Sequence, residues 1–169
     1  QFAAGTDSGS AYLITSTMPR EGKTTVAANL SAALAQGGSR VILVEGDMRR
    51  PSFHHIFQFD TEVDGGTPLG LSNLLLEQTL PLETAMYDVG VPRLKVIKGG
   101  AIPANPADLL GSDRMFQIIL ELRKQCDYLL IDTPPILSAA DPMILSGKMD
   151  GILLVATLGE TRGDDFRNA

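Results

Sequence analysis

Short, continuous apolar runs recur along the chain, separated by segments in which apolar residues return every three or four positions. Runs of this kind occupy residues 13–16, 41–44, 94–97, 128–131 and 152–155. A continuous run, unlike an alternating one, is typical of a strand that is buried on both faces. The intervening segments have helical spacing. The pattern therefore predicts an α/β fold, in which a mostly parallel β-sheet is flanked by helices on both faces.

Two helices are predicted in detail. Residues 23–36 are expected to form the first, which ends at Gly37 and Gly38, and residues 113–125 the second, with Ser112 as its cap. The expected buried face of the first carries Val26, Leu30, Ala33 and Leu34, and that of the second Met115, Ile118, Ile119 and Leu122. Between the second and third runs lies a long excursion, residues 48–93, with a Gly-rich loop at 64–66 and a short helix near 72–77. We expect this excursion at the surface.

The first strand breaks into a loop that leads directly into the first helix. The loop contains Gly22, Lys23 and Thr24, which match the end of the phosphate-binding pattern Gly-x-x-x-x-Gly-Lys-Ser/Thr. A helix start offers unpaired N–H groups and the positive end of the helix dipole to a phosphate. Thr17 stands where the pattern has its first glycine, so an ordinary capped helix remains the alternative for this motif alone.

Acidic residues follow two of the other predicted strands. Glu45 and Asp47 follow the second, and Asp132 follows the run 128–131. In open α/β sheets ligands bind beyond the carboxyl ends of the strands, so these carboxylates are expected to converge near the loop. Asp132 has the form of a Walker B acid, which holds magnesium beside a nucleotide; its alternative is a residue that merely ends the strand before a proline.

Composition narrows the function further. The 169 residues, 44% of them hydrophobic, suffice for a single domain, residues 1–169. A net charge of −6 argues against a nucleic-acid partner, which needs clustered cations. The single cysteine, Cys126, excludes an internal disulfide and fits the cytoplasm. No run approaches the length of a membrane span. Because the chain starts at Gln1 and ends shortly after an apolar run, we expect a piece truncated at both ends.

Several motifs together resemble one family. Residues 41–51 carry a hydrophobic run, an acid, Asp47, Arg49, Arg50 and Pro51, which is similar to the Walker A′ motif of bacterial tyrosine kinases, and residues 15–25, 70–72, 102–110 and 127–135 also resemble that family. The resemblance implies a P-loop NTPase-like fold and an ATP- and Mg²⁺-dependent protein-tyrosine autokinase that regulates capsule or exopolysaccharide export. It implies a transmembrane chain-length-determinant protein or segment as partner, a location at the inner face of the membrane, homo-oligomers and a protein-tyrosine phosphatase.

The resemblance also assigns roles to residues. Lys23 is expected to hold the β- and γ-phosphates, Asp47 to accept the proton of the tyrosine hydroxyl, and Arg49 to assist catalysis. The nucleotide-binding residues implied are Glu21, Gly22, Lys23, Thr24 and Thr25, and the magnesium ligands implied are Thr24, Glu45, Asp47 and Asp132.

Two positions depart from the family's pattern. Glu45 replaces the usual Asp, and Arg20 replaces a common Gly, which adds a charge that either helps or obstructs the phosphates. Asp141 either orients an active-site loop or caps a helix, and we favour the cap. A partition-type ATPase switch and a nucleotide-binding scaffold without turnover remain the competing functions.

Overall fold

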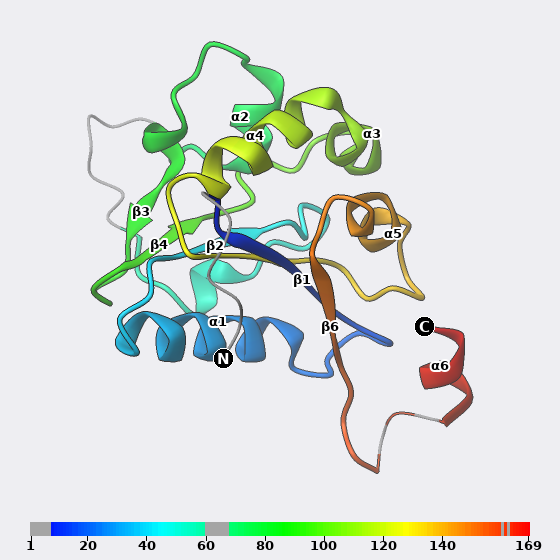
Figure 1. Cartoon of the computed structure of the whole chain (residues 1–169). Coiled ribbons are helices and arrows are strands. Elements are labelled where there is room, and N and C mark those ends of the chain that lie inside the picture. The colour runs from blue at the N-terminus through cyan, green and yellow to red at the C-terminus, as the bar shows by residue number, and fades with distance from the viewer. Residues whose placement is uncertain (1–7, 60–67, 160, 162) are drawn as a thin grey trace.

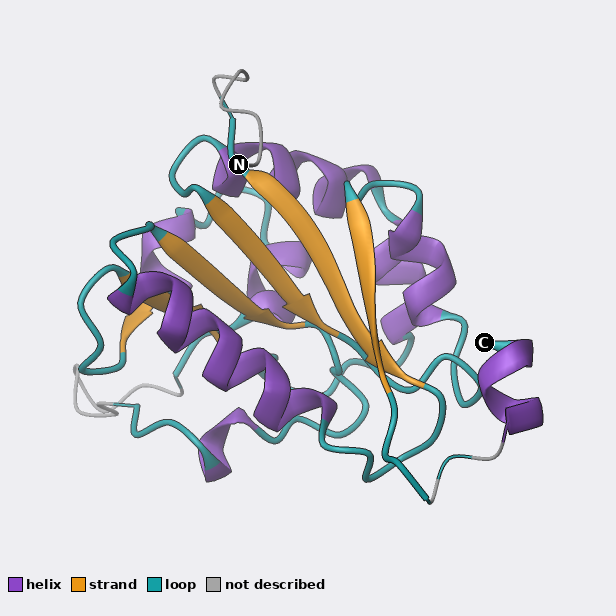
Figure 2. Ribbon diagram, turned by 60° about the horizontal axis from the view of Figure 1, so that its bottom comes forward, coloured by secondary structure: helices purple, strands orange, loops and turns teal. Residues whose placement is uncertain are grey.

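A computed structural model describes residues 8–59, 68–159, 161 and 163–169 of the chain; the predicted Gly-rich loop at 64–66 lies outside these ranges. Its centre is a six-stranded sheet with the order β3-β4-β2-β5-β1-β6 (Figures 1 and 2). All neighbouring strands are parallel except β3, which is antiparallel to β4. The strands are β1 (Ser10–Ser16), β2 (Val41–Glu45), β3 (Tyr87–Asp88), β4 (Leu94–Ile97), β5 (Tyr128–Asp132) and β6 (Gly151–Val155). The predicted fold class is confirmed.

Helices cover both faces of this sheet. Helix α1 (Lys23–Gln36) lies on one face, and Figure 1 shows α2, α3, α4 and α5 gathered on the other. These are α2 (Leu71–Leu76), α3 (Pro106–Gly111), α4 (Asp113–Arg123) and α5 (Asp141–Ser146), and α6 (Gly163–Asn168) follows β6. Short 3-10 helices span Phe53–His55 and Leu82–Ala85.

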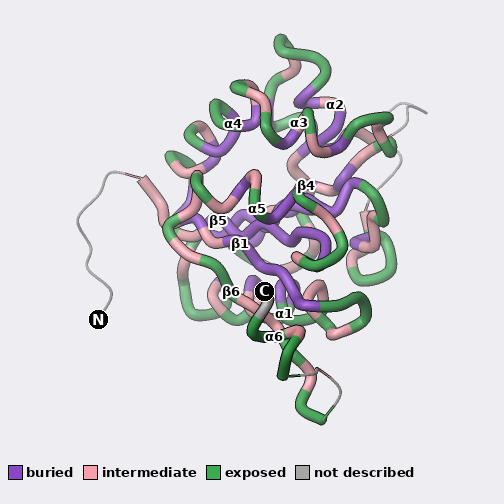
Figure 3. The backbone as a smooth tube through the Cα atoms, turned by 90° about the vertical axis from the view of Figure 1, so that its right-hand side faces the viewer, coloured by how far each residue is buried: buried purple, intermediate pink, exposed green. Residues whose placement is uncertain are grey.

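The two faces of the strands build two separate apolar cores. Successive side chains of a strand point to opposite faces, so Leu13 joins the core under α2 to α5 while Ile14 joins the core under α1. The inner strands are buried almost throughout (Figure 3). β6 is an edge strand and is partly exposed, which the continuous apolar run at 152–155 did not indicate.

The predicted face of α4 is confirmed, with all four expected residues buried and Ser112 accepting a hydrogen bond from the Met115 N–H at 3.2 Å. The predicted face of α1 is confirmed only for Leu30 and Leu34, which pack against the core, and is wrong for Val26 and Ala33. Its buried residues are Ala27, Ala28, Ser31 and Ala35, whereas Val26 is 42% exposed. Small side chains let the helix lie close to the sheet, and the larger Leu30 and Leu34 are only partly buried where they pack against the core.

The excursion at 48–93 is also not a simple surface segment. Met48, Phe53, Leu71 and Leu74 are fully buried, and they fill both cores beside the strand ends.

Within the described part of the chain, no helix is both long enough and apolar enough to cross a membrane.

Candidate functional site

Three strand ends bring opposite charges together at one point. The Lys23 Nζ, at the start of α1, lies 3.3 Å from Asp132 Oδ2 at the end of β5 and 3.5 Å from Asp47 Oδ2 beyond β2. Asp132 is fully buried and Asp47 is 7% exposed. The convergence expected from the sequence is therefore observed for Lys23, Asp47 and Asp132.

The pKa of the Asp132 carboxyl group is raised well above its ordinary value. Burial raises its pKa to about 6, although the nearby Lys23 ammonium and the Thr24 hydroxyl, which donates to Asp132 Oδ2 at 2.7 Å, both lower it. The Asp47 carboxylate is a smaller cause of this raised pKa. A buried carboxylate that its surroundings compensate only in part is a favourable place for an additional cation.

The donor set fits magnesium. Asp132 and Thr24 offer a carboxylate and a hydroxyl oxygen side by side, the hard ligands that Mg²⁺ prefers. Among the described residues, no group of three His, Cys, Asp or Glu side chains is placed to hold a metal alone. In nucleotide sites the protein usually supplies one or two magnesium ligands and the phosphates supply more.

The loop before α1 is held by its own glutamate. The Glu21 carboxylate accepts from the Thr17 hydroxyl and the Met18 N–H, each at 2.8 Å, and from the hydroxyl of Thr161 in the segment after β6. Burial opposes ionisation of Glu21, but these hydrogen bonds outweigh it and lower the pKa of the carboxyl group. The Glu21 side chain thus fixes the loop, and the four-residue spacing of Thr17 and Glu21 is a local signal for this contact. The expectation that Glu21 binds the nucleotide stays a prediction.

Backbone conformation explains part of the loop's composition. Gly22 has φ +83° and no neighbour near its missing Cβ, and Arg20 has φ +70°. The left-handed region is costly for side chains other than glycine, so the family's glycine at position 20 suits the backbone better than arginine does. Gly22 precedes α1, and the N–H groups at the start of that helix, including those of Thr24 and Thr25, are available to a phosphate.

Glu45 does not face this cluster. It is 2% exposed, and its Oε1 accepts from the N–H groups of Ser52 and Phe53 while its Oε2 accepts from the Gly99 N–H at 2.7 Å. The longer side chain thus joins the segment after β2 to the end of β4. We do not retain Glu45 as a magnesium ligand, because both oxygens are occupied by backbone donors.

The guanidinium group of Arg49 forms a bidentate ion pair with the Asp141 carboxylate. Its Nε and Nη2 donate to the two carboxylate oxygens at 3.0 and 2.9 Å, and Asp141 is fully buried. The expected cap is therefore wrong: Ala140 occupies the N-cap position of α5, and the Asp141 side chain orients Arg49 instead. The two residues lie 92 positions apart, so no local spacing could have paired them.

A pocket of about 520 Å³ opens beside the charged cluster. Its walls combine apolar and cationic side chains around Asp47. The lining residues are Pro19, Arg20, Lys23, Asp47, Arg49, Arg50, Ser52, Pro134, Pro135, Ser138 and Ala139. Pro134 and Pro135 belong to the segment 127–135 that resembles the kinase family, whereas Ser138 and Ala139 were not anticipated.

Comparisons with known proteins place this geometry among related enzymes. A family model described as "AAA domain" matches residues 21–158. The tyrosine-protein kinase YwqD of Bacillus subtilis (strain 168) is 37% identical over 169 residues, which cover all of this chain and 68% of the relative. The kinase domain of the Escherichia coli tyrosine kinase ETK superposes with a TM-score of 0.85 at 29% identity, over 97% of this chain and 62% of that one.

An ATPase outside the kinases shares the fold as well. The cell division ATPase MinD of Pyrococcus furiosus has a TM-score of 0.68 at 30% identity, over 87% of this chain and 59% of that structure. Three other curated relatives, 34–38% identical, are much longer proteins, of which the chain covers 21%.

Proposed function

Because this chain belongs to the family of bacterial tyrosine-protein kinases, we propose that its site transfers the γ-phosphoryl group of ATP to a tyrosine hydroxyl. The observation that carries the proposal is Asp47. It lies 3.5 Å from the phosphate-loop lysine and lines an open pocket with apolar walls. An ATPase switch needs only water at this point, whereas a carboxylate beside such a pocket suits a phenol that must be deprotonated.

Each residue then has a task. The N–H groups at the start of α1 and the Lys23 ammonium bind the phosphates, and Thr24 and Asp132 would hold Mg²⁺, which neutralises charge on the phosphate oxygens. Asp47 accepts the hydroxyl proton. Arg49, held in place by Asp141, presents positive charge at the same pocket. The transition state is loose and negatively charged, so positioned cations supply most of the acceleration.

The wider assignment rests on the resemblance alone. We propose that the chain is the catalytic domain of a longer autokinase that regulates capsule or exopolysaccharide export. Its partners would be further copies of itself, a transmembrane chain-length-determinant protein or segment that holds it at the inner face of the membrane, and a protein-tyrosine phosphatase.

The test compares phosphotyrosine formation with ATP binding. Incubation of the protein with ATP and Mg²⁺ is expected to produce phosphotyrosine on added tyrosine polymers or on the parent protein. Lys23→Ala should abolish both ATP binding and the signal, whereas Asp47→Asn should abolish the signal and keep ATP bound. Asp127→Asn, an exposed carboxylate outside the pocket, is the control expected to behave as the parent.

The competing functions give different outcomes. ATP hydrolysis without phosphotyrosine would indicate that the protein is a partition-type ATPase switch. ATP binding without any turnover would indicate a nucleotide-binding scaffold. Either result would refute the kinase proposal.

A further inference from the structure

Two cations at the candidate active site have no partner in the described part of the protein. Arg20 and Arg50 both line the pocket beside Asp47, and both are exposed. Among the described residues neither guanidinium group makes a hydrogen bond or an ion pair, in contrast to Arg49, which Asp141 holds. With Lys23, the pocket is lined by four cationic side chains and one carboxylate, in a chain whose net charge is −6.

Arg20 is retained where the backbone disfavours it. At φ +70° a residue with a side chain is strained relative to an ordinary conformation, and glycine would avoid this strain. Strained residues of this kind cluster at functional sites, where the side chain contributes something that the permissive residue lacks. What arginine adds over glycine here is a positive charge in the wall of the pocket.

The position of the pocket indicates which ligand this charge meets. Of the loop residues 19–25, only Pro19, Arg20 and Lys23 line it, while Gly22, Thr24 and Thr25, at the phosphate-binding helix start, do not. The remaining wall comes from the segments after β2 and β5. The two arginines therefore line the same pocket as Asp47, the proposed base, and of the helix start only Lys23 reaches that pocket.

We propose that Arg20 and Arg50 select tyrosines that are flanked by acidic residues. The inference rests on the proposed kinase function and names its substrate class. The apolar walls accommodate the phenol ring, Asp47 takes its proton, and the two arginines pair with glutamate or aspartate side chains beside the tyrosine. Exposed pairs of this kind are individually weak, and together they correspond to roughly a threefold to tenfold preference when both act. The preference should weaken as salt is raised, since exposed charges are screened.

The experiment uses two synthetic peptides of equal length, one with glutamate and one with glutamine on both sides of a single tyrosine. Their binding to the protein loaded with a non-hydrolysable ATP analogue and Mg²⁺ is measured by fluorescence anisotropy, and their phosphorylation by kcat/KM. We expect the parent protein to favour the acidic peptide by about fivefold in both measurements, and Arg20→Gly to reduce that ratio to about twofold or less.

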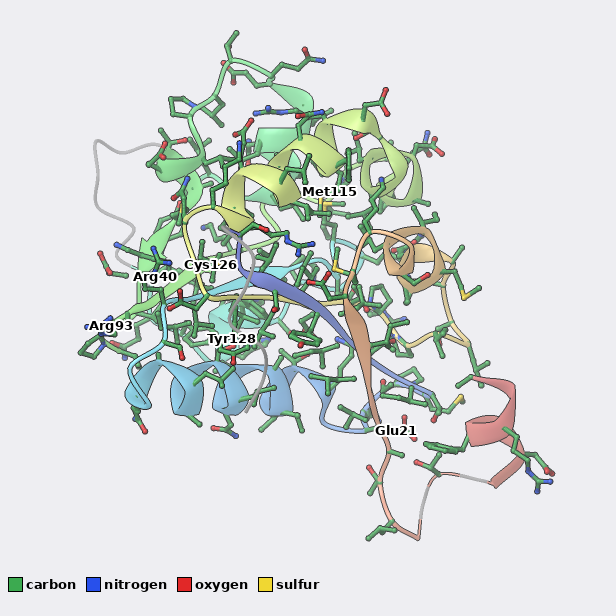
Figure 4. All side chains as sticks on the ribbon, viewed as in Figure 1. Glu21, Arg40, Arg93, Met115, Cys126 and Tyr128 are labelled. Carbon is green, nitrogen blue, oxygen red and sulfur yellow. The ribbon has the colours of Figure 1, made fainter. Side chains whose placement is uncertain are left out.

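Arg93→Gly is the matched control. Arg93 is also exposed and has φ +68°, so the substitution changes the backbone and the net charge in the same way. It precedes β4, however, and Figure 4 shows it beside Arg40 at the opposite end of the sheet from Glu21. This variant should keep the full preference for the acidic peptide.

Each contrary result has a defined meaning. Equal loss on both peptides in Arg20→Gly would overturn the proposal in favour of an effect on the transferred phosphoryl group, and weaker binding of the ATP analogue would overturn it in favour of a nucleotide contact. No preference in the parent protein would overturn it directly. If acidic peptides bind preferentially but no peptide is phosphorylated, the selection survives and the kinase function fails, so the two proposals are separable.

Discussion

Replacing Asp132 by asparagine should make the protein more stable while it removes a proposed magnesium ligand. The carboxyl group is fully buried, and its pKa rises from 3.8 to about 6 on folding, chiefly because burial disfavours the charge. One unit of pKa shift corresponds to about 1.4 kcal/mol, so ionised Asp132 costs the folded state up to about 3 kcal/mol near pH 7. Asparagine avoids that cost and keeps an oxygen for the Thr24 hydroxyl.

The pKa of about 6 already includes the attraction of Lys23, whose ammonium lies 3.3 Å from Asp132, so the loss of that attraction is not subtracted again. In the variant the ammonium keeps Asp47, at 3.5 Å, as a charged partner among the residues that the structure describes. A net gain of up to about 3 kcal/mol is therefore expected, measured as the free energy of unfolding in urea in the absence of nucleotide.

The pH dependence identifies the cause. A carboxyl group whose pKa is higher in the folded state than in the unfolded state contributes stability below pH 4, and this contribution is lost as the pH rises through 6. The asparagine amide does not titrate in this range. The stability advantage of Asp132→Asn over the parent should therefore grow between pH 4 and pH 6 and level off above pH 7.

Asp127→Asn is the matched control at an exposed carboxylate. Hydrogen bonds and charge from Arg40 lower the pKa of Asp127, so the sign reverses: its ionised form stabilises the fold near neutral pH, and the variant should lose a little stability there. An Asp132→Asn protein that is less stable than the parent at pH 7.5, or a difference that does not change with pH, would refute this account of the site.

Three further results are expected. Glu45→Gln should lower the free energy of unfolding by about 1–3 kcal/mol, because the amide N–H₂ of glutamine then faces N–H donors that the carboxylate accepted. An unchanged free energy of unfolding in urea titrations would contradict the three contacts described. Arg20→Gly and Arg93→Gly should each stabilise the protein by up to about 1 kcal/mol, since relief of the positive φ exceeds the added entropy of the unfolded chain; thermal denaturation checks both. Burial raises the pKa of Cys126 to about 12, so iodoacetamide should label it at pH 8 only after unfolding, and rapid labelling of the native protein would show that the thiol is accessible.

Much of the fold follows from the sequence because inner strands of a parallel sheet are buried on both sides. Four of the five apolar runs became buried strands, and α1 began and ended where Lys23 and Gly37 indicated. β3 escaped prediction, because a strand of two residues has no periodicity. The buried face of α1 was missed because Ala27, Ala28 and Ala35 carry a weaker hydrophobic signal than leucine.

The sequence predicted those site residues that directly follow a strand, because the end of the strand fixes where such a residue lies. Lys23, Asp47 and Asp132 each follow a strand end, and the topology alone brings them together. Contacts between distant segments were not predictable. Asp141 pairs with Arg49, and Glu45 turns to Gly99, only because the chain returns to the same edge of the sheet.

The alanine face of α1 makes the reaction centre sensitive to distant changes. The helix has 14 residues and is about 21 Å long, and its first residue is Lys23. A larger side chain at Ala35, at the far end of α1, would push that end of the helix away from the sheet. Because the helix moves as one body, the Lys23 ammonium at its other end would shift away from the Asp47 and Asp132 carboxylates. A substitution at this remote, apolar position would then reduce turnover although it changes no polar group of the site.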